Sequence, residues 1–95
     1  MRKLELVIDA GSLPTVREII NKSGAKGFTV VNVIEGKGEE GYKKAIPELN
    51  SLEQYYVFVI CSAEESKKLV DGLTPYISSV GGVLFTSTLD SYISK

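Results

Sequence analysis

Two segments of this chain carry apolar side chains on both faces of a strand, which limits the folds that it can adopt. Gly27–Glu35, "GFTVVNVIE", and Tyr55–Cys61, "YYVFVIC", are rich in the β-branched and aromatic residues typical of strands. An antiparallel sheet with one face in water alternates apolar and polar residues along its strands, and neither segment does so. We therefore expect both sheet faces to be covered, one by helices and the other by further copies of the chain.

The remaining elements complete a βαββαβ order. Lys3–Asp9 reads as a first strand and Val83–Thr86 as a short fourth one, and apolar residues at helical spacing follow the first and third strands. This order predicts a single α+β, ferredoxin-like domain over residues 1–95. Its antiparallel sheet would carry two helices on one face and would pack inward in an oligomer. The tail after Thr86 fits either a strand or a short helix.

Both expected helices carry signals for their ends. Ser12 is a favoured N-cap residue, Pro14 lies in the first turn, and Gly24 suits the position after the last turn. Ser62 and Glu65 have the spacing of a capping box at the start of the second helix. We therefore expect the helices to begin just after Ser12 and Ser62.

A long polar segment separates the second and third strands. Residues 36–53 contain three glycines, one proline and seven charged residues, and few apolar side chains. Loops of this length in a compact domain are usually functional or disordered. We expect residues 36–53 to form an exposed loop that belongs to the function of the protein rather than to its core.

Composition excludes several classes of function. The chain has no histidine and one cysteine, Cys61, so a Ser-His-Asp site, a Cys-His site and a histidine-containing zinc site cannot be built from it. The formal net charge of −1 argues against nucleic-acid binding. The chain shows neither a signal peptide nor an apolar run of about 20 residues, which a membrane span needs. These features predict a cytoplasmic protein that is not an enzyme and has no metal site.

Specific residues now point to a family. The chain resembles the PII signalling proteins and their PII-like relatives over nearly its whole length, through Val16–Glu18, Gly24, Lys26–Val33, the pair Gly36 and Gly38, and Val80–Phe85. The resemblance implies a homotrimer whose sheets face the three-fold axis, with ligand clefts between neighbouring subunits. It also implies that residues 36–53 form the T-loop, which docks on a membrane transporter or a metabolic enzyme. The small effector of the family is usually an adenine nucleotide, so AMP, ADP or ATP is the candidate ligand and no cofactor is obligatory.

The resemblance also assigns candidate site residues. The ligand-binding set is Phe28, Thr29, Gly36, Lys37, Gly38, Glu39, Gly81 and Gly82, with the first two contributed from the adjacent subunit. The partner-binding part of the loop is Glu40, Gly41, Tyr42, Lys43 and Lys44. Glycines at these places would let the backbone approach an anion and present successive N–H groups to it. The alternative is that the four ligand-set glycines only end strands and turns.

The chain departs from the family at the cations that meet the phosphates. Glu39 stands where nucleotide-binding members have an arginine, Val83 and Gln54 stand where they have lysines, and the terminal arginine pair is missing. Lys37 and Lys95 remain. Because a triphosphate carries about three to four negative charges, and burying charge without partners is costly, tight ATP binding is not expected. AMP, a small carboxylate or no small ligand stay open.

Two other functions fit the same fold. One is a protein-interaction module whose loop binds a partner without any ligand. The other is an ion-handling trimer of the CutA type. The chain has no histidine and only one cysteine, which argues against the binding of soft metals. Glu39, Glu40 and Glu48 could hold a hard cation, although such a group of charges is usually a solvated surface.

Overall fold

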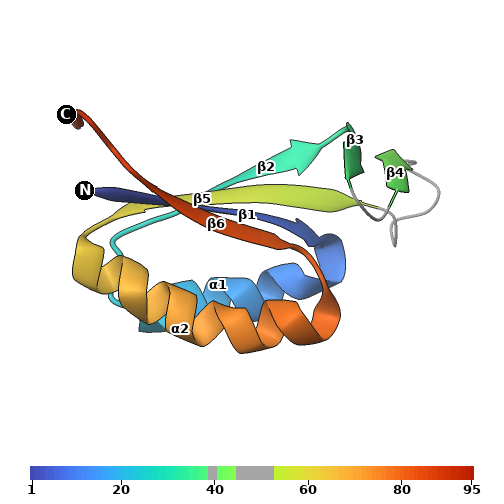
Figure 1. Cartoon of the computed structure of the whole chain (residues 1–95), viewed down its shortest axis with the longest axis horizontal. Helices are drawn as coiled ribbons and strands as arrows, with labels where there is room; N and C mark the ends of the chain where they lie inside the picture. Colours follow the sequence, from blue (N-terminus) through green and yellow to red (C-terminus); the bar gives the residue numbers. More distant parts are fainter. Residues whose placement is uncertain (39–40, 45–52) are drawn as a thin grey trace.

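A four-stranded antiparallel sheet with two helices on one of its faces forms the body of the protein (Figure 1). The computed structural model describes residues 1–38, 41–44 and 53–95. Its elements are β1 (Arg2–Asp9), the 3-10 turn η1 (Ala10–Ser12), α1 (Leu13–Lys22), β2 (Thr29–Val33), β3 (Glu35–Gly38), β4 (Gly41–Lys44), β5 (Gln54–Cys61), α2 (Ala63–Val80) and β6 (Val83–Thr88). The sheet, helices and strand order confirm the predicted ferredoxin-like βαββαβ fold.

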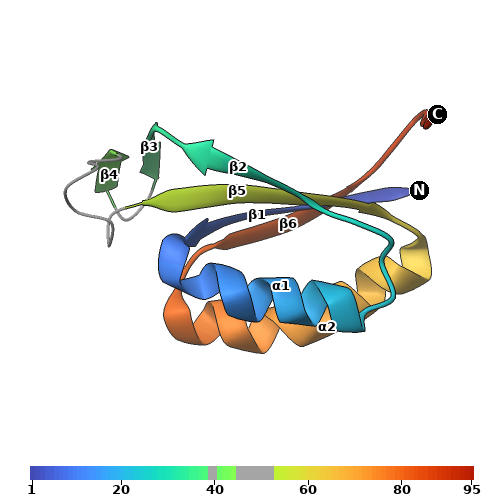
Figure 2. The ribbon, with the colours of Figure 1, turned by 180° about the vertical axis from the view of Figure 1, so that it is seen from behind.

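The sheet has the strand order β2-β5-β1-β6, and every neighbouring pair is antiparallel. In the middle of the sheet Leu6 of β1 pairs with Val57 of β5 on one side and with Leu84 of β6 on the other. The two helices lie side by side beneath this sheet, as the view from behind also shows (Figure 2). The central strands β1 and β5 therefore carry the core between sheet and helices.

The core consists of the side chains that the central strands and the helices turn toward each other. Each helix contributes one apolar stripe, as the helical spacing predicted. The fully or almost fully buried apolar residues are Leu4, Leu6, Ile8, Val16, Ile20, Val57, Val59, Cys61, Leu69, Leu73 and Ile77. Burial raises the pKa of the Cys61 thiol, which suits a packing residue rather than a reactive one.

The two helices begin differently. At α2 the capping box is present: the Ser62 hydroxyl accepts a hydrogen bond from the Glu65 N–H at 3.1 Å, and the Glu65 carboxylate accepts one from the Ser62 N–H at 2.9 Å. That backbone N–H lowers the pKa of Glu65. The prediction of a side-chain cap at Ser12 was wrong, because the turn η1 runs directly into α1 and leaves Ser12 buried in helical conformation without a side-chain cap bond.

The second strand is shorter than predicted, and the expected loop contains a ribbon. β2 ends at Val33, Ile34 is exposed, and β3 begins at Glu35. β3 and β4 then pair with each other as a separate two-stranded antiparallel sheet. At the other end of the chain β6 extends to Thr88, beyond the predicted Thr86, and the tail that follows forms neither a strand nor a helix.

No helix among the described residues is both long enough and apolar enough to cross a membrane.

Candidate functional site

The sheet face that points away from the helices is largely apolar, and no helix of the described chain covers it (Figure 1). The register places one alternation of each strand on this open face, and Lys3 and Glu5 of β1 belong to it. Its apolar members include Val7 of β1, Val31 of β2, Tyr56, Phe58 and Ile60 of β5, and Val83 and Phe85 of β6. Val31 and Phe85 are each 47% exposed. The prediction that the third strand is apolar on both sides is thus confirmed. In the second strand Val30 and Val31 lie on opposite sides as predicted, but Ile34 lies outside β2 and is exposed.

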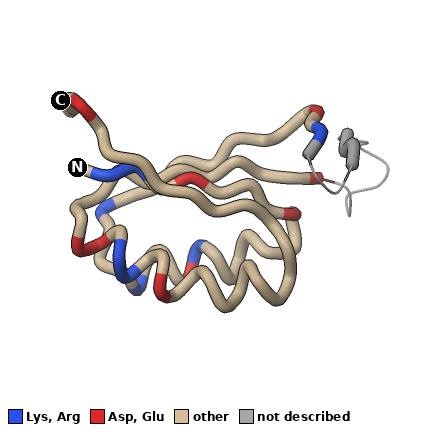
Figure 3. The backbone as a smooth tube through the Cα atoms, viewed as in Figure 1, with Lys and Arg blue, Asp and Glu red and all other residues tan. Residues whose placement is uncertain are grey.

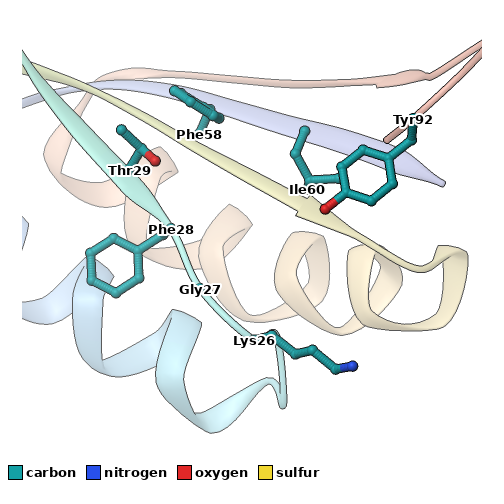
Figure 4. A pocket seen from close by; sticks show the side chains of 7 residues that line it. All are labelled: Lys26, Gly27, Phe28, Thr29, Phe58, Ile60 and Tyr92. Atoms are coloured by element: carbon teal, nitrogen blue, oxygen red, sulfur yellow. The ribbon is translucent and has the colours of Figure 1, made fainter. Parts of the chain in front are cut away.

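A shallow hollow of about 260 Å³ lies where the open face meets the start of β2 (Figure 4). It is lined by Lys26, Gly27, Phe28, Thr29, Phe58, Ile60 and Tyr92. The lining comes from three parts of the chain: the segment that enters β2, the end of β5 and the tail after β6. In Figure 4 the ring of Tyr92 lies beside Ile60, so the tail forms one wall of the hollow.

The lining offers aromatic surface and little charge. Three of its residues carry aromatic rings, of which the Phe28 ring points to the helix side and packs against the core (Figure 4). The Thr29 and Tyr92 hydroxyls can donate or accept hydrogen bonds, and Lys26 is its one cation. The pKa of Glu65 is lowered chiefly by the Ser62 backbone N–H and in smaller part by the charge of Lys26, so this cation lies near the start of α2. Such a lining suits a flat ring with a single anionic group better than a highly charged ligand.

The predicted ligand residues fall into two groups within one chain. Phe28 and Thr29 line the hollow at the start of β2. Gly36, Lys37 and Gly38 form β3, beyond the other end of β2, and the pair Gly81 and Gly82 joins α2 to β6 at that same end of the sheet (Figures 1 and 2). A single chain therefore does not bring the two groups together.

The glycine pair after α2 has a conformational role of its own. Gly81 has φ 92° and its N–H bonds to the carbonyl of Ile77, and Gly82 has φ 131°, in the range that favours glycine. A Cβ atom on Gly82 would lie 2.9 Å from the backbone oxygen of Val7. The fold therefore requires glycine at position 82, whatever ligand it also meets.

The loop residues predicted to contact ligand or partner begin in the ribbon. Gly36 pairs with Lys43, Lys37 with Tyr42, and Gly38 with Gly41, so these backbones run antiparallel. Glu39 and Glu40 lie outside the described residues. The assignments of Gly36–Gly38 to ligand and of Gly41–Lys44 to a partner stay predictions.

Sequence reasoning missed several residues of the hollow. Lys26, Ile60 and Tyr92 line it, although none was predicted as a ligand residue. Lys26 could have been found, because it directly precedes the Gly-Phe-Thr segment that was selected. Tyr92 gave no signal in the sequence, because its place depends on how the tail after β6 runs.

Within the described ranges, no group of three or more histidine, cysteine, aspartate or glutamate side chains lies close enough together to hold a metal ion.

Comparison with known proteins identifies the class to which this fold belongs. Residues 1–94 match the model of the family "Nitrogen regulatory protein P-II". The chain therefore belongs to the nitrogen regulatory protein P-II family. A search of curated proteins gave no significant match.

Solved structures of PII-like proteins share the fold. The structure of CPII from Thiomonas intermedia K12 bound to ADP and bicarbonate has a TM-score of 0.78 and 22% identity, with 90% of this chain and 82% of that chain covered. Another structure of CPII is described as bound to ADP, AMP and bicarbonate, with a TM-score of 0.75, 22% identity and the same coverage. A putative PII-like signaling protein from Thermus thermophilus has a TM-score of 0.73 and 17% identity, covering 90% of this chain and 83% of that one.

Proposed function

We propose that this protein is a cytoplasmic, non-enzymatic PII-like regulator that assembles as a homotrimer and binds a small effector between its subunits. The observation that carries the proposal is the open sheet face with the hollow at its edge. Apolar area left in water forgoes about 25 cal/mol per Å², a serious loss for a small domain. Two further copies that cover this face would recover that free energy.

The separation of the predicted ligand residues supports a site between subunits. One group lies at the start of β2 and the other at the far end of the sheet. In a closed ring of three copies, the hollow of one chain would face the Gly36–Gly38 and Gly81–Gly82 end of its neighbour. A cyclic assembly repeats this contact at every interface, so the trimer would hold three equivalent clefts.

The lining of the hollow supports an effector with few charges. Tyr92 offers surface for a flat base, and Lys26 and Lys37 offer two cations from the two halves of the cleft. Two cations balance a monophosphate better than a triphosphate, whose unpaired charges would be costly to bury. We propose AMP or ADP as the effector, bound more tightly than ATP. The binding of ADP, AMP and bicarbonate described for CPII supports this choice and makes bicarbonate a second candidate.

Thermal unfolding tests the effector. A ligand that binds only the native state stabilises it by RT ln(1 + [L]/Kd), about 2.7 kcal/mol at one hundred times Kd, which raises Tm by roughly 10 °C or more in a chain of this size. We expect a rise with AMP and ADP, a smaller one with ATP, and loss of the AMP effect in Tyr92→Ala. Ile93→Ala is the matched control, because Ile93 is 95% exposed and lies outside the hollow. If none of AMP, ADP, ATP and bicarbonate changes Tm, the effector proposal fails and a ligand-independent interaction module remains.

We further propose that residues 36–53, with Glu40–Lys44 as the main contact, carry the signal to a membrane transporter or a metabolic enzyme. β4, Gly41–Lys44, is paired only with β3 among the described strands, so the ribbon projects from the body of the protein (Figure 1). The full chain should capture its target from a membrane or cytosol extract of its own cells, and a chain with residues 36–53 replaced by a short glycine-serine linker should not. Capture that survives this replacement would contradict the proposal.

A further inference from the structure

A polar cluster interrupts the open face at its centre. The Tyr56 hydroxyl donates a hydrogen bond to Glu5 Oε1 at 2.5 Å, and Lys3 Nζ lies 3.4 Å from the same oxygen. Lys3 Nζ also lies over the Phe58 ring, 5.3 Å from its centroid. Charges elsewhere in the described chain lie mainly along the helices and toward the strand ends (Figure 3). The cluster therefore places an ion pair within the open face, whose apolar surface would otherwise be continuous.

The position of Glu5 makes this pair costly to cover. Its cross-strand neighbours on the two sides are Phe58 and Phe85, and its side chain is only 15% exposed even in the isolated chain. A further copy packed on this face would remove the remaining water. Taking an ion pair out of water is repaid only when its remaining hydrogen-bonding groups also find partners.

The cluster has hydrogen-bonding capacity left over. Within the described chain both contacts of the Glu5 carboxylate go to Oε1, and the Lys3 ammonium has three N–H donors. Hydrogen bonding to Tyr56 and the nearby Glu5 carboxylate raise the pKa of Lys3, so its amine stays charged at neutral pH. One acceptor and several donors are thus left for further hydrogen bonds, at the centre of a surface where one positive and one negative charge lie together. Such a surface is complementary to a second copy of itself.

We propose that Lys3 and Glu5 of neighbouring copies pair with each other and thereby fix the register of the assembly. The proposal rests on the proposed trimer, in which the three open faces meet at one axis. A shifted or partly closed assembly would keep the ion pair within each chain but bury the second Glu5 oxygen and the spare Lys3 N–H groups without hydrogen-bond partners, which is costly. Lys3 and Glu5 thus act as specificity residues of the interface, and the apolar side chains around them supply its affinity.

Complementary charge reversal tests the pairing. Lys3→Glu gives every chain two acids in the cluster and Glu5→Lys gives every chain two bases, so we expect each variant alone to need at least tenfold higher concentration to assemble. An equimolar mixture of the two variants should form mixed oligomers, because chains of one kind then offer acids to the bases of the other. Native mass spectrometry separates the mixed species from the single ones if one variant carries a short mass tag.

Each outcome decides the pairing. Mixed oligomers from two variants that fail alone support it, and reversed variants that assemble as the wild type does overturn it. Failure of both variants without rescue in the mixture also overturns it, because the cluster would then act only within a chain. A wild-type chain that is monomeric would overturn the proposed trimer itself, which is a separate result.

Variants that remove a charge without reversing it test the same pairing if a charge-reversed chain misfolds. Lys3→Gln and Glu5→Gln keep a polar side chain at each position and remove one charge each. We expect each to raise the dissociation concentration about tenfold, and the double variant to assemble more tightly than either, because it leaves no charge unpaired. Equal assembly of all four chains would overturn the proposal.

Discussion

Substitution Val31→Lys is expected to convert the proposed trimer to a monomer. Val31 lies on the open face and is 47% exposed in the isolated chain, so the single chain can accommodate a lysine there. In the assembly the change would remove an apolar contact of about 1.5–3 kcal/mol and bury an unpaired ammonium at a further cost of several kcal/mol. Since every 1.4 kcal/mol is tenfold in an equilibrium constant, we expect the dissociation concentration to rise by more than about a hundredfold. Light scattering coupled to size-exclusion chromatography measures this.

The matched control for this prediction is Val80→Lys. Val80 is the same residue type, is 46% exposed and ends α2 on the helix side of the molecule. A lysine there is favourable for a helix C-terminus and should leave the assembly unchanged. If the two variants behave alike, the open face is not the assembly surface.

Substitution Gly82→Ala is expected to cause a large loss of folding stability for the addition of a single methyl group. Gly82 has φ 131°, and an added Cβ would meet the Val7 carbonyl oxygen at 2.9 Å, where neither backbone can give way without breaking the β1–β6 pairing. We expect the free energy of unfolding to fall by about 3 kcal/mol, from backbone strain and overpacking together. For a chain of this size that lowers Tm by roughly 10 °C or more.

Gly11→Ala is the control for this substitution. Gly11 has no atom within 4 Å of an added Cβ and no positive φ, so a change of at most about 0.5 kcal/mol is expected. Both variants should be unfolded in urea at one protein concentration, because the stability of an oligomer depends on it. A Gly82→Ala chain as stable as Gly11→Ala would mean that the turn after α2 can relax, and the structural requirement argued for Gly82 would be wrong.

Much of the fold was predictable because its signals are local. Alternation in residues 3–9 and apolar runs in residues 55–61 mark the central strands, and the Ser62–Glu65 spacing marks the start of α2. The side-chain cap at Ser12 was mispredicted because residue type alone does not show that the chain enters α1 through a 3-10 turn. The β3–β4 ribbon was missed because glycine and lysine are poor strand formers, and only pairing with each other orders them.

The candidate site was less predictable because it depends on contacts between distant segments. Phe28 and Thr29 were selected through the family resemblance, and the structure places them in the hollow. Tyr92 reaches the same hollow through the path of the tail. The Lys3–Glu5–Tyr56 cluster joins residues 51 positions apart, so it becomes visible only once the register between β1 and β5 is known.

The proposed effector sites require three chains that close their open faces on one another. Sedimentation equilibrium of the wild-type protein at micromolar concentration tests this assembly most directly. We expect a single species of about 31 kDa, three times the 10.3 kDa of one chain, at every concentration in that range. A stable species of 10.3 kDa would contradict it, since the apolar face would then remain in water and no cleft between subunits could form.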